Sequence, residues 1–114
     1  MKQVEKHHCH GGELSVWTHV SNVLGCEMTF SIFVPPQAKN KDVPCVTFLS
    51  GLTCTHDNFT SKAGAYAHAA KEGIIIVAPD TSPRGDDVPD DDASYDFGKG
   101  AGFYINATQA PWDK

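Results

Sequence analysis

The segment from Val43 to Pro79 decides the fold class, because two strand patterns flank one helical pattern there. Its strand patterns are Cys45-Val46-Thr47-Phe48-Leu49 and Ile74-Ile75-Ile76-Val77-Ala78. Continuous apolar, β-branched runs of this kind are typical of parallel strands that are covered on both faces. Between the two runs, apolar residues recur at the spacing of one amphipathic helix: Phe59, Ala63, Tyr66, Ala67 and Ala70. The sequence therefore predicts a right-handed βαβ crossover unit and an α/β fold.

Capping residues mark both ends of this predicted helix. Asp57 or Asn58 is the expected N-cap, since short polar side chains accept bonds from the first free backbone N–H groups. Gly73 follows the helical pattern and can adopt the left-handed conformation that ends a helix.

Two further strand patterns precede the crossover unit. Apolar side chains alternate loosely from Leu14 to Val20 and strictly from Cys26 to Val34. The strict alternation predicts a half-buried strand with one apolar face: Cys26, Met28, Phe30, Ile32 and Val34. Residues 21–25 between the runs are short and turn-prone, so the two strands are expected to form an antiparallel hairpin. Pro35-Pro36 ends the second strand.

Length and charge limit the classes of function. With 114 residues the chain has room for one domain and a modest core. Its net charge of −5 repels phosphate backbones and anionic lipid, so neither a nucleic acid nor a membrane is an expected partner. The first ten residues are too polar for a signal peptide, which makes a cytoplasmic location the default. The four cysteines form no Cys-x-x-Cys pair, and reduced thiols are expected.

A long irregular segment follows Pro79 and runs to Trp112. It is rich in Asp, Gly and Pro, and seven of the 14 acidic residues lie between Asp80 and Asp96. A loop of that length within a compact domain usually builds a functional site.

Three motifs in this order carry a resemblance to a known family. They are Leu49-Ser50-Gly51-Leu52-Thr53-Cys54-Thr55, Ala78-Pro79-Asp80-Thr81-Ser82-Pro83-Arg84-Gly85 and Gly100-Ala101-Gly102-Phe103-Tyr104. With them the chain resembles the S-formylglutathione hydrolase family, also called esterase D, over essentially its whole length.

The resemblance implies an α/β-hydrolase fold and hydrolysis of the thioester S-formylglutathione to glutathione and formate. It implies a Ser-Asp-His triad and no cofactor. None of the seven serines stands within a Gly-x-Ser-x-Gly elbow. Residues 1–114 are therefore interpreted as the N-terminal portion of a single α/β-hydrolase domain, an incomplete fold, with nucleophile elbow and triad expected after residue 114. Without the triad, the chain alone is expected to be inactive. The family's strand order, 1-2-4-3-5, would leave Cys45–Leu49 without one neighbour, so the chain alone is also expected to be poorly soluble.

The loop from Ser50 to Thr55 lies between a parallel strand and a helix, where open α/β folds bind ligands. The resemblance assigns the backbone N–H of Leu52 to the oxyanion hole, with Gly51 allowing a sharp turn. Cys54 is expected to be a thiol close to the active site rather than the nucleophile, with simple packing as the alternative. Gly100 and Gly102, with Phe103, are expected to let the backbone approach the acyl pocket.

Other polar residues carry competing interpretations. Arg84 could clamp a carboxylate of glutathione, or pin its loop by pairing with Asp80 or Asp96. His56 resembles a general base but is expected to be a surface loop residue. His7-His8-Cys9-His10 is assigned to a solvated N-terminus, and Asp86–Asp92 lacks the calcium-loop pattern, so no metal site is expected.

The predicted function is that of a serine-dependent thioester hydrolase acting on a small molecule, S-formylglutathione. A broader carboxylesterase or acyltransferase of the same fold is the alternative within enzymes. A non-enzymatic remnant that binds glutathione or a protein partner is the alternative outside them. A homodimer of the complete enzyme is left open.

Overall fold

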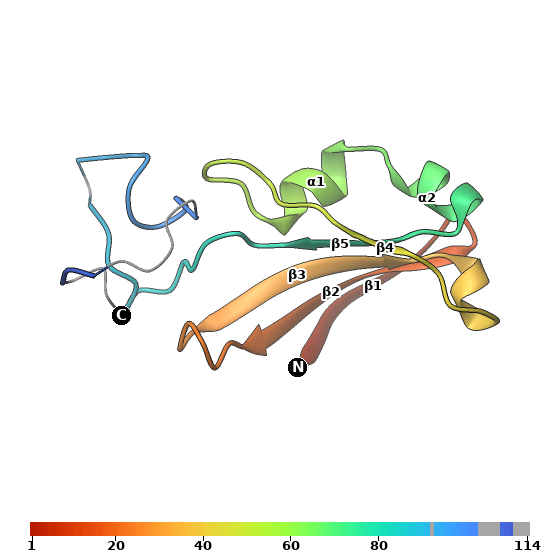
Figure 1. Cartoon of the computed structure of the whole chain (residues 1–114), viewed down its shortest axis with the longest axis horizontal. Coiled ribbons are helices and arrows are strands. Elements are labelled where there is room, and N and C mark those ends of the chain that lie inside the picture. The colour runs from red at the N-terminus through yellow and green to blue at the C-terminus, as the bar shows by residue number, and fades with distance from the viewer. Residues whose placement is uncertain (92, 103–107, 111–114) are drawn as a thin grey trace.

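The computed structural model describes residues 1–91, 93–102 and 108–110 (Figure 1). Its five strands form one mixed sheet in the order β1-β2-β3-β5-β4. The strands are β1 (Lys2–Cys9), β2 (Gly12–Val20), β3 (Glu27–Val34), β4 (Cys45–Thr47) and β5 (Ile75–Pro79). A short 3-10 turn, η1 (Pro36–Lys39), follows β3, and the helices are α1 (His56–Lys62) and α2 (Tyr66–Glu72). No helix of the described part of the chain is long and apolar enough to cross a membrane.

The predicted antiparallel hairpin is confirmed as β2 and β3, which pair from Glu13↔Val34 to Val20↔Glu27. The strand before it was not predicted. β1 pairs with β2 through a tight turn in which His10 and Gly11 have φ of 49° and 75°. Two consecutive left-handed residues are what a hairpin turn of matching twist requires. The histidine cluster therefore lies on an edge strand and its turn, where His7, His8 and His10 are exposed to solvent as expected, although the regular strand was not predicted.

The buried face of β3 is the one opposite to the predicted apolar face. Ser31 and Phe33 are 1% and 0% exposed, whereas Phe30 and Ile32 are only half-buried. Both helices lie on one side of the sheet in Figure 1, and the Thr60 hydroxyl donates to the Ser31 oxygen at 2.6 Å. The alternation correctly predicts a strand, but helix packing decides which of its faces is covered.

The single helix predicted across residues 57–72 is in fact two. α1 ends at Lys62 and α2 begins at Tyr66, with Gly64 between them at a φ of 63°. A left-handed residue cannot continue an α-helix, so the helical axis breaks there. The N-cap prediction is also wrong, because Thr55 caps α1 in a capping box with Asn58. Gly73 ends α2 at a φ of 72°, as predicted.

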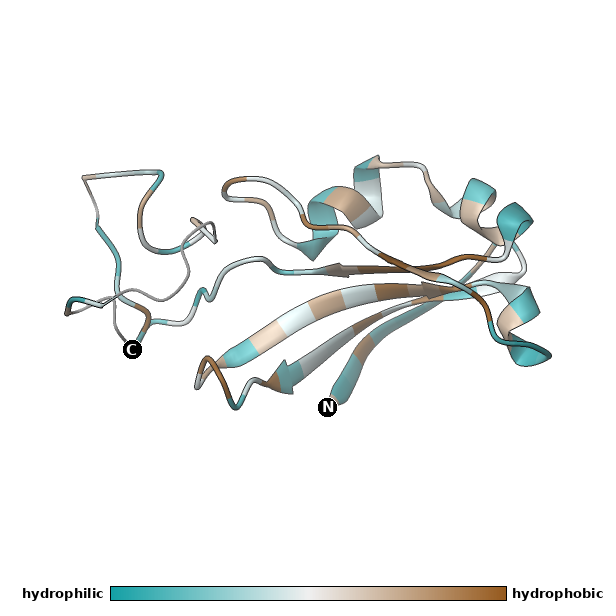
Figure 2. Cartoon of the chain, in the orientation of Figure 1, coloured by the Kyte–Doolittle hydropathy of each residue, from teal (hydrophilic) through white to brown (hydrophobic). Residues whose placement is uncertain are grey.

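The core lies between the helices and the centre of the sheet. Its buried members are Phe33, Phe59, Tyr66, Ala69, Ala70, Ile76 and Ala78. The Tyr66 ring contacts Phe33 at 5.1 Å and meets Phe59 edge-on at 6.2 Å between centroids. Burial raises the pKa of the Tyr66 phenol above its ordinary value of 10.0, an effect that the Thr60 and Ser31 hydroxyls partly offset. The apolar residues of β5 form the most hydrophobic stretch of the sheet (Figure 2).

β4 and β5 pair in parallel, which confirms the predicted crossover, but β4 is short and lies at the edge of the sheet. The expectation that it is covered on both faces is not met in the described chain. Val46 and Leu49 are 49% and 67% exposed, and β5 is the only described strand paired with β4. The edge position agrees with the strand order that the resemblance implied.

We expect the 114-residue chain to self-associate through β4, because its unpaired backbone groups and exposed apolar side chains can add a strand from a neighbour. Val46→Lys should reduce this association, since a charged side chain on an edge strand opposes pairing. Val4→Lys is the matched control, because Val4 lies on the other edge strand with 47% exposure against 49% for Val46. Light scattering of the three proteins at equal concentration measures the effect. Equal association of all three would show that β4 is not the contact.

Candidate active site

The candidate site forms where β4 and β5 end at the same edge of the sheet (Figure 1). The Phe48 N–H donates to the Val77 carbonyl at 2.8 Å, so the parallel pairing continues one residue beyond the end of β4. The chain after β4 then enters the Ser50–Thr55 loop, and the chain after β5 enters the long loop at Asp80. Parallel strands place these two loops side by side, which is where ligands bind in open α/β sheets.

A tight turn from Gly51 to Cys54 is the centre of this site. The Cys54 N–H donates to the Gly51 carbonyl at 3.1 Å. The left-handed residue of the turn is Thr53, with a φ of 62°. Gly51 has no such φ, and a Cβ placed on it would meet nothing within 4 Å. The expectation that Gly51 provides the sharp turn is therefore wrong, because the residue with a positive φ is Thr53.

Leu52 lies half-buried at the second position of this turn. Its backbone N–H donates to no group within the described residues. The next N–H along, that of Thr53, donates to the Gly100 carbonyl at 2.9 Å. Within the described residues the turn leaves the Leu52 N–H without an acceptor at the edge of the sheet, and the oxyanion-hole role that the resemblance assigned to it stays a prediction.

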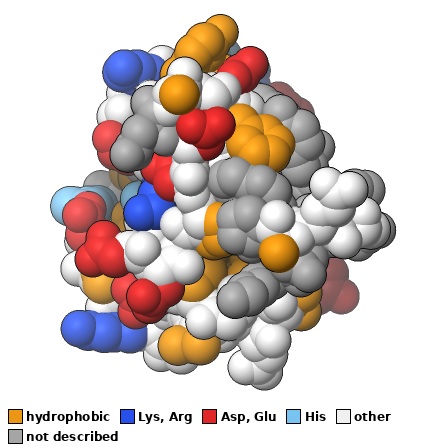
Figure 3. All heavy atoms as spheres, turned by 90° about the vertical axis from the view of Figure 1, so that its left-hand side faces the viewer, with side chains coloured by type: hydrophobic (Ala, Val, Ile, Leu, Met, Phe, Trp, Pro, Cys, Tyr) orange, Lys and Arg blue, Asp and Glu red, His pale blue; other side chains and the backbone are white. Residues whose placement is uncertain are grey.

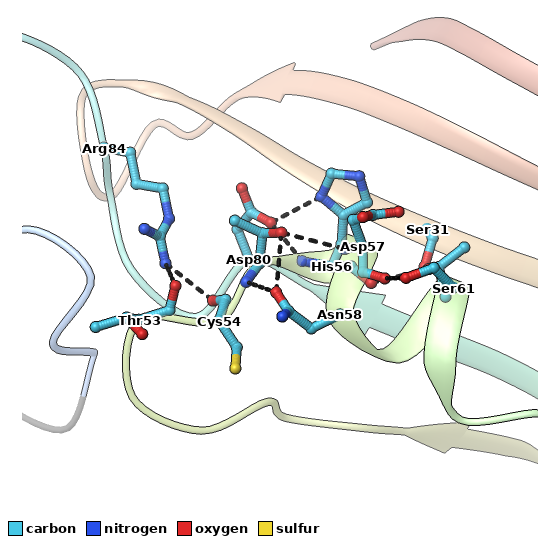
Figure 4. Close-up of polar contacts among 11 residues, drawn as sticks. Ser31, Thr53, Cys54, His56, Asp57, Asn58, Ser61, Asp80 and Arg84 are labelled. Carbon is cyan, nitrogen blue, oxygen red and sulfur yellow. Dashed lines mark hydrogen bonds and ion pairs between the residues drawn. The ribbon is translucent and has the colours of Figure 1, made fainter.

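The long loop holds the turn from the other side. Arg84 donates through Nη2 to the Thr53 carbonyl at 3.0 Å and to the Cys54 carbonyl at 2.9 Å (Figure 4). The Gly100 N–H donates to the buried Ser82 hydroxyl at 3.0 Å. Arg84 thus holds the Ser50–Thr55 loop through backbone carbonyls. The predicted pairing of Arg84 with Asp80 is wrong, because the Asp80 carboxylate bonds to His56.

His56 and Asp80 form a pair that the sequence did not predict. One oxygen of the Asp80 carboxylate lies 2.8 Å from His56 Nδ1 and accepts the His56 backbone N–H at 2.7 Å (Figure 4). The His56 side chain is 20% exposed, so it is not a free surface residue. Asp80 directly follows β5, and His56 begins α1 at the end of the loop after β4. Because the two strands were predicted to be parallel, these positions could have indicated that the two side chains lie close together. The pair joins the start of α1 to the end of β5.

Cys54 is half-buried and its thiol is free, like those of the other cysteines. It directly precedes Thr55, the N-cap of α1. In Figure 4 its sulfur points away from the His56–Asp80 pair. The structure therefore places Cys54 in the same turn as Leu52, and its role as a thiol close to the active site stays a prediction.

Close backbone approach is the common feature of the glycines in the long loop. A Cβ on Gly102 would collide with the Thr81 carbonyl, and a Cβ on Gly98 would collide with the Asp90 carboxylate. Gly100 has a φ of 82°, and a Cβ there would crowd Arg84 at 3.3 Å. Phe103, the remaining predicted pocket residue, lies outside the described residues.

Charge around the site is mainly acidic. Figure 3 views the molecule from the end that carries the long loop, and acidic side chains gather on that face. Asp86, Asp87, Asp90 and Asp91 are all exposed. No group of three or more His, Cys, Asp or Glu side chains that could hold a metal ion is present in the part of the chain that is described.

Comparison with known proteins relates the chain to esterases. The model of the Esterase family, described as "Putative esterase", matches residues 21–114. An S-formylglutathione hydrolase from Agrobacterium tumefaciens is 46% identical and superimposes with a TM-score of 0.94 over 99% of this chain. This chain spans only 41% of that protein's length. A ferulic acid esterase is 20% identical, with a TM-score of 0.54 over 60% of this chain and 30% of its own length, and shows likeness of fold.

We expect Gly102→Ala to destabilise the fold and Gly51→Ala to leave it nearly unchanged. The methyl group at position 102 would overlap the Thr81 carbonyl, whereas position 51 is open. Forced overlap with backbone typically costs about 1–3 kcal/mol of unfolding free energy. Urea unfolding of both variants provides the comparison, with the unsubstituted chain as reference. Equal midpoints for the two variants would contradict the close approach of residue 102 to the strand-end loop.

Proposed function

The chain belongs to the Esterase family, and on that premise we propose that it is the N-terminal part of an α/β-hydrolase that converts S-formylglutathione to glutathione and formate. The observation that carries the proposal is the turn at the sheet edge, whose Leu52 N–H has no partner among the described residues. The 46% identity to the Agrobacterium hydrolase supports the choice of substrate. In this proposal the triad lies in sequence that follows residue 114 of the complete enzyme.

The proposed reaction proceeds in two acyl-transfer steps. The serine oxygen attacks the thioester carbonyl carbon while the histidine takes the hydroxyl proton. The carbonyl oxygen becomes an oxyanion, and the Leu52 N–H donates a hydrogen bond to it. Collapse of the tetrahedral intermediate breaks the carbon–sulfur bond, and glutathione leaves as its thiol after receiving the proton. Water, activated by the same histidine, then attacks the formyl ester and releases formate.

Leu52 contributes through its backbone, so the side chain is secondary. A donor held in place before the reaction stabilises the charge that develops on the carbonyl oxygen, without the cost of reorienting a solvent molecule. Two features support this role. Leu52 is half-buried, and hydrogen bonds to the long loop fix the backbone of Thr53 and Cys54, the two residues that follow it.

A chimaeric enzyme tests the proposed function. Residues 1–114 replace the matched segment of the Agrobacterium hydrolase, and the chimaera is assayed with S-formylglutathione and with a neutral aryl ester. We expect turnover of S-formylglutathione by the chimaera and none by residues 1–114 alone. The parent hydrolase is the positive control, and circular dichroism checks folding. A folded chimaera that hydrolyses the aryl ester but not the thioester would favour a broader carboxylesterase and overturn the proposed substrate.

In this chimaera, Leu52→Pro should lower kcat by about 100- to 1000-fold, because proline removes the backbone donor to the oxyanion. Leu52→Ala keeps the N–H and should retain most of the activity. Both variants are compared by circular dichroism and thermal melting, so that a distorted turn is recognised. Similar kcat values for two equally folded variants would remove Leu52 from the oxyanion hole.

Cys54 should be the cysteine of this chain whose alkylation blocks turnover, because its thiol lies in the same turn as Leu52. Cys54→Ser should retain substantial activity and lose the sensitivity to alkylation. Cys45→Ser is the matched control, since Cys45 is exposed on β4 and outside the turn. Mass spectrometry identifies the modified residue. A folded but inactive Cys54→Ser enzyme would contradict the non-nucleophilic role.

A further inference from the structure

We propose that Arg84 is a positioning residue that holds the Gly51–Cys54 turn in the shape needed to present the Leu52 N–H. The inference rests on the proposed function, in which that N–H binds the oxyanion. It assigns to Arg84 a role in transition-state stabilisation without contact with the substrate.

The turn needs an external support because of Thr53. This residue has a φ of 62°, in the left-handed region, and a β-branched side chain is disfavoured there by about 1–2 kcal/mol. The hydrogen bond from Cys54 to Gly51 closes the turn locally, but it leaves the carbonyls of Thr53 and Cys54 without a partner inside the turn. Contacts from elsewhere must therefore stabilise this conformation.

Arg84 supplies those contacts from the long loop. A single guanidinium nitrogen donates to both carbonyls, at 3.0 Å for Thr53 and 2.9 Å for Cys54 (Figure 4). The Gly100 carbonyl meanwhile accepts the Thr53 N–H at 2.9 Å. Both backbone polar groups of Thr53 are thus bonded to the same loop. Since the orientation of the Thr53 peptide groups sets the geometry of the turn, the guanidinium also fixes the direction of the Leu52 N–H.

A carboxylate of glutathione is the competing partner for Arg84. The structure favours the positioning role because the Nη2 atom is already engaged by two backbone carbonyls of the turn.

The test compares Arg84→Ala and Arg84→Lys in the chimaeric enzyme, with two substrates. For a positioning residue, kcat should fall about 10- to 100-fold in Arg84→Ala with S-formylglutathione and equally with a neutral aryl ester, while KM changes little. Arg84→Lys should retain part of the activity, because an ammonium can reach one carbonyl but lacks the planar fork. Lys62→Ala, which removes an exposed cation from the end of α1, is the control and should behave like the unsubstituted enzyme.

Hydrogen exchange of the Thr53 amide, measured by NMR on the same proteins, gives a readout that does not need activity. We expect exchange in Arg84→Ala to be at least about tenfold faster, because the bond to Gly100 opens when the turn relaxes. A rise of KM confined to S-formylglutathione would identify a carboxylate clamp and overturn the inference. A lower melting temperature with unchanged kcat would show a purely structural role and overturn it as well.

Failure of the proposed function gives a different pattern. If the unsubstituted chimaera acts on the aryl ester alone, the thioester proposal fails, while the loss of kcat in Arg84→Ala still decides the inference. If the chimaera acts on neither substrate, the exchange rate of the Thr53 amide decides whether Arg84 holds the turn, and an unchanged rate overturns that claim.

Discussion

The parallel pairing of β4 with β5 is the constraint on which the site depends. Its register runs from Cys45↔Ile75 to Thr47↔Val77, and the bond from Phe48 to Val77 extends it by one residue. Because the strands run in one direction, the turn at Gly51–Cys54 and the loop after Pro79 begin at the same edge. Hydrogen bonds can then form between the two loops: His56 bonds to the Asp80 carboxylate, and Arg84 donates to the Thr53 carbonyl.

The parts of the fold that could be predicted are those with a local physical signal. The apolar runs around residues 45–49 and 74–78 correctly predict two parallel strands, although the first of them is exposed rather than covered on both faces. Gly73 ends a helix as a residue free to adopt positive φ should. The turn that carries Leu52 was located through its position after a strand and before a helix, and its role through the family's motif.

What could not be predicted depends on partners far away in the sequence. β1 is a polar strand at an edge, and its residues carry no apolar alternation that would distinguish it from a solvated tail. The apolar pattern of β3 does not indicate which face the helices will cover. Arg84 bonds to backbone carbonyls, which any residue can offer, so no motif of side chains marks Thr53 and Cys54 as its partners.

The central claim is that the Leu52 N–H is held ready to bind the oxyanion, and NMR of this amide tests it most directly. The chimaeric enzyme, labelled with ¹⁵N, is titrated with a boronic acid that forms a tetrahedral adduct with the catalytic serine and places an oxygen in the oxyanion hole. A hydrogen bond to that oxygen should move the Leu52 amide proton strongly downfield and slow its exchange with water. An unchanged Leu52 resonance in the fully formed adduct would contradict the claim.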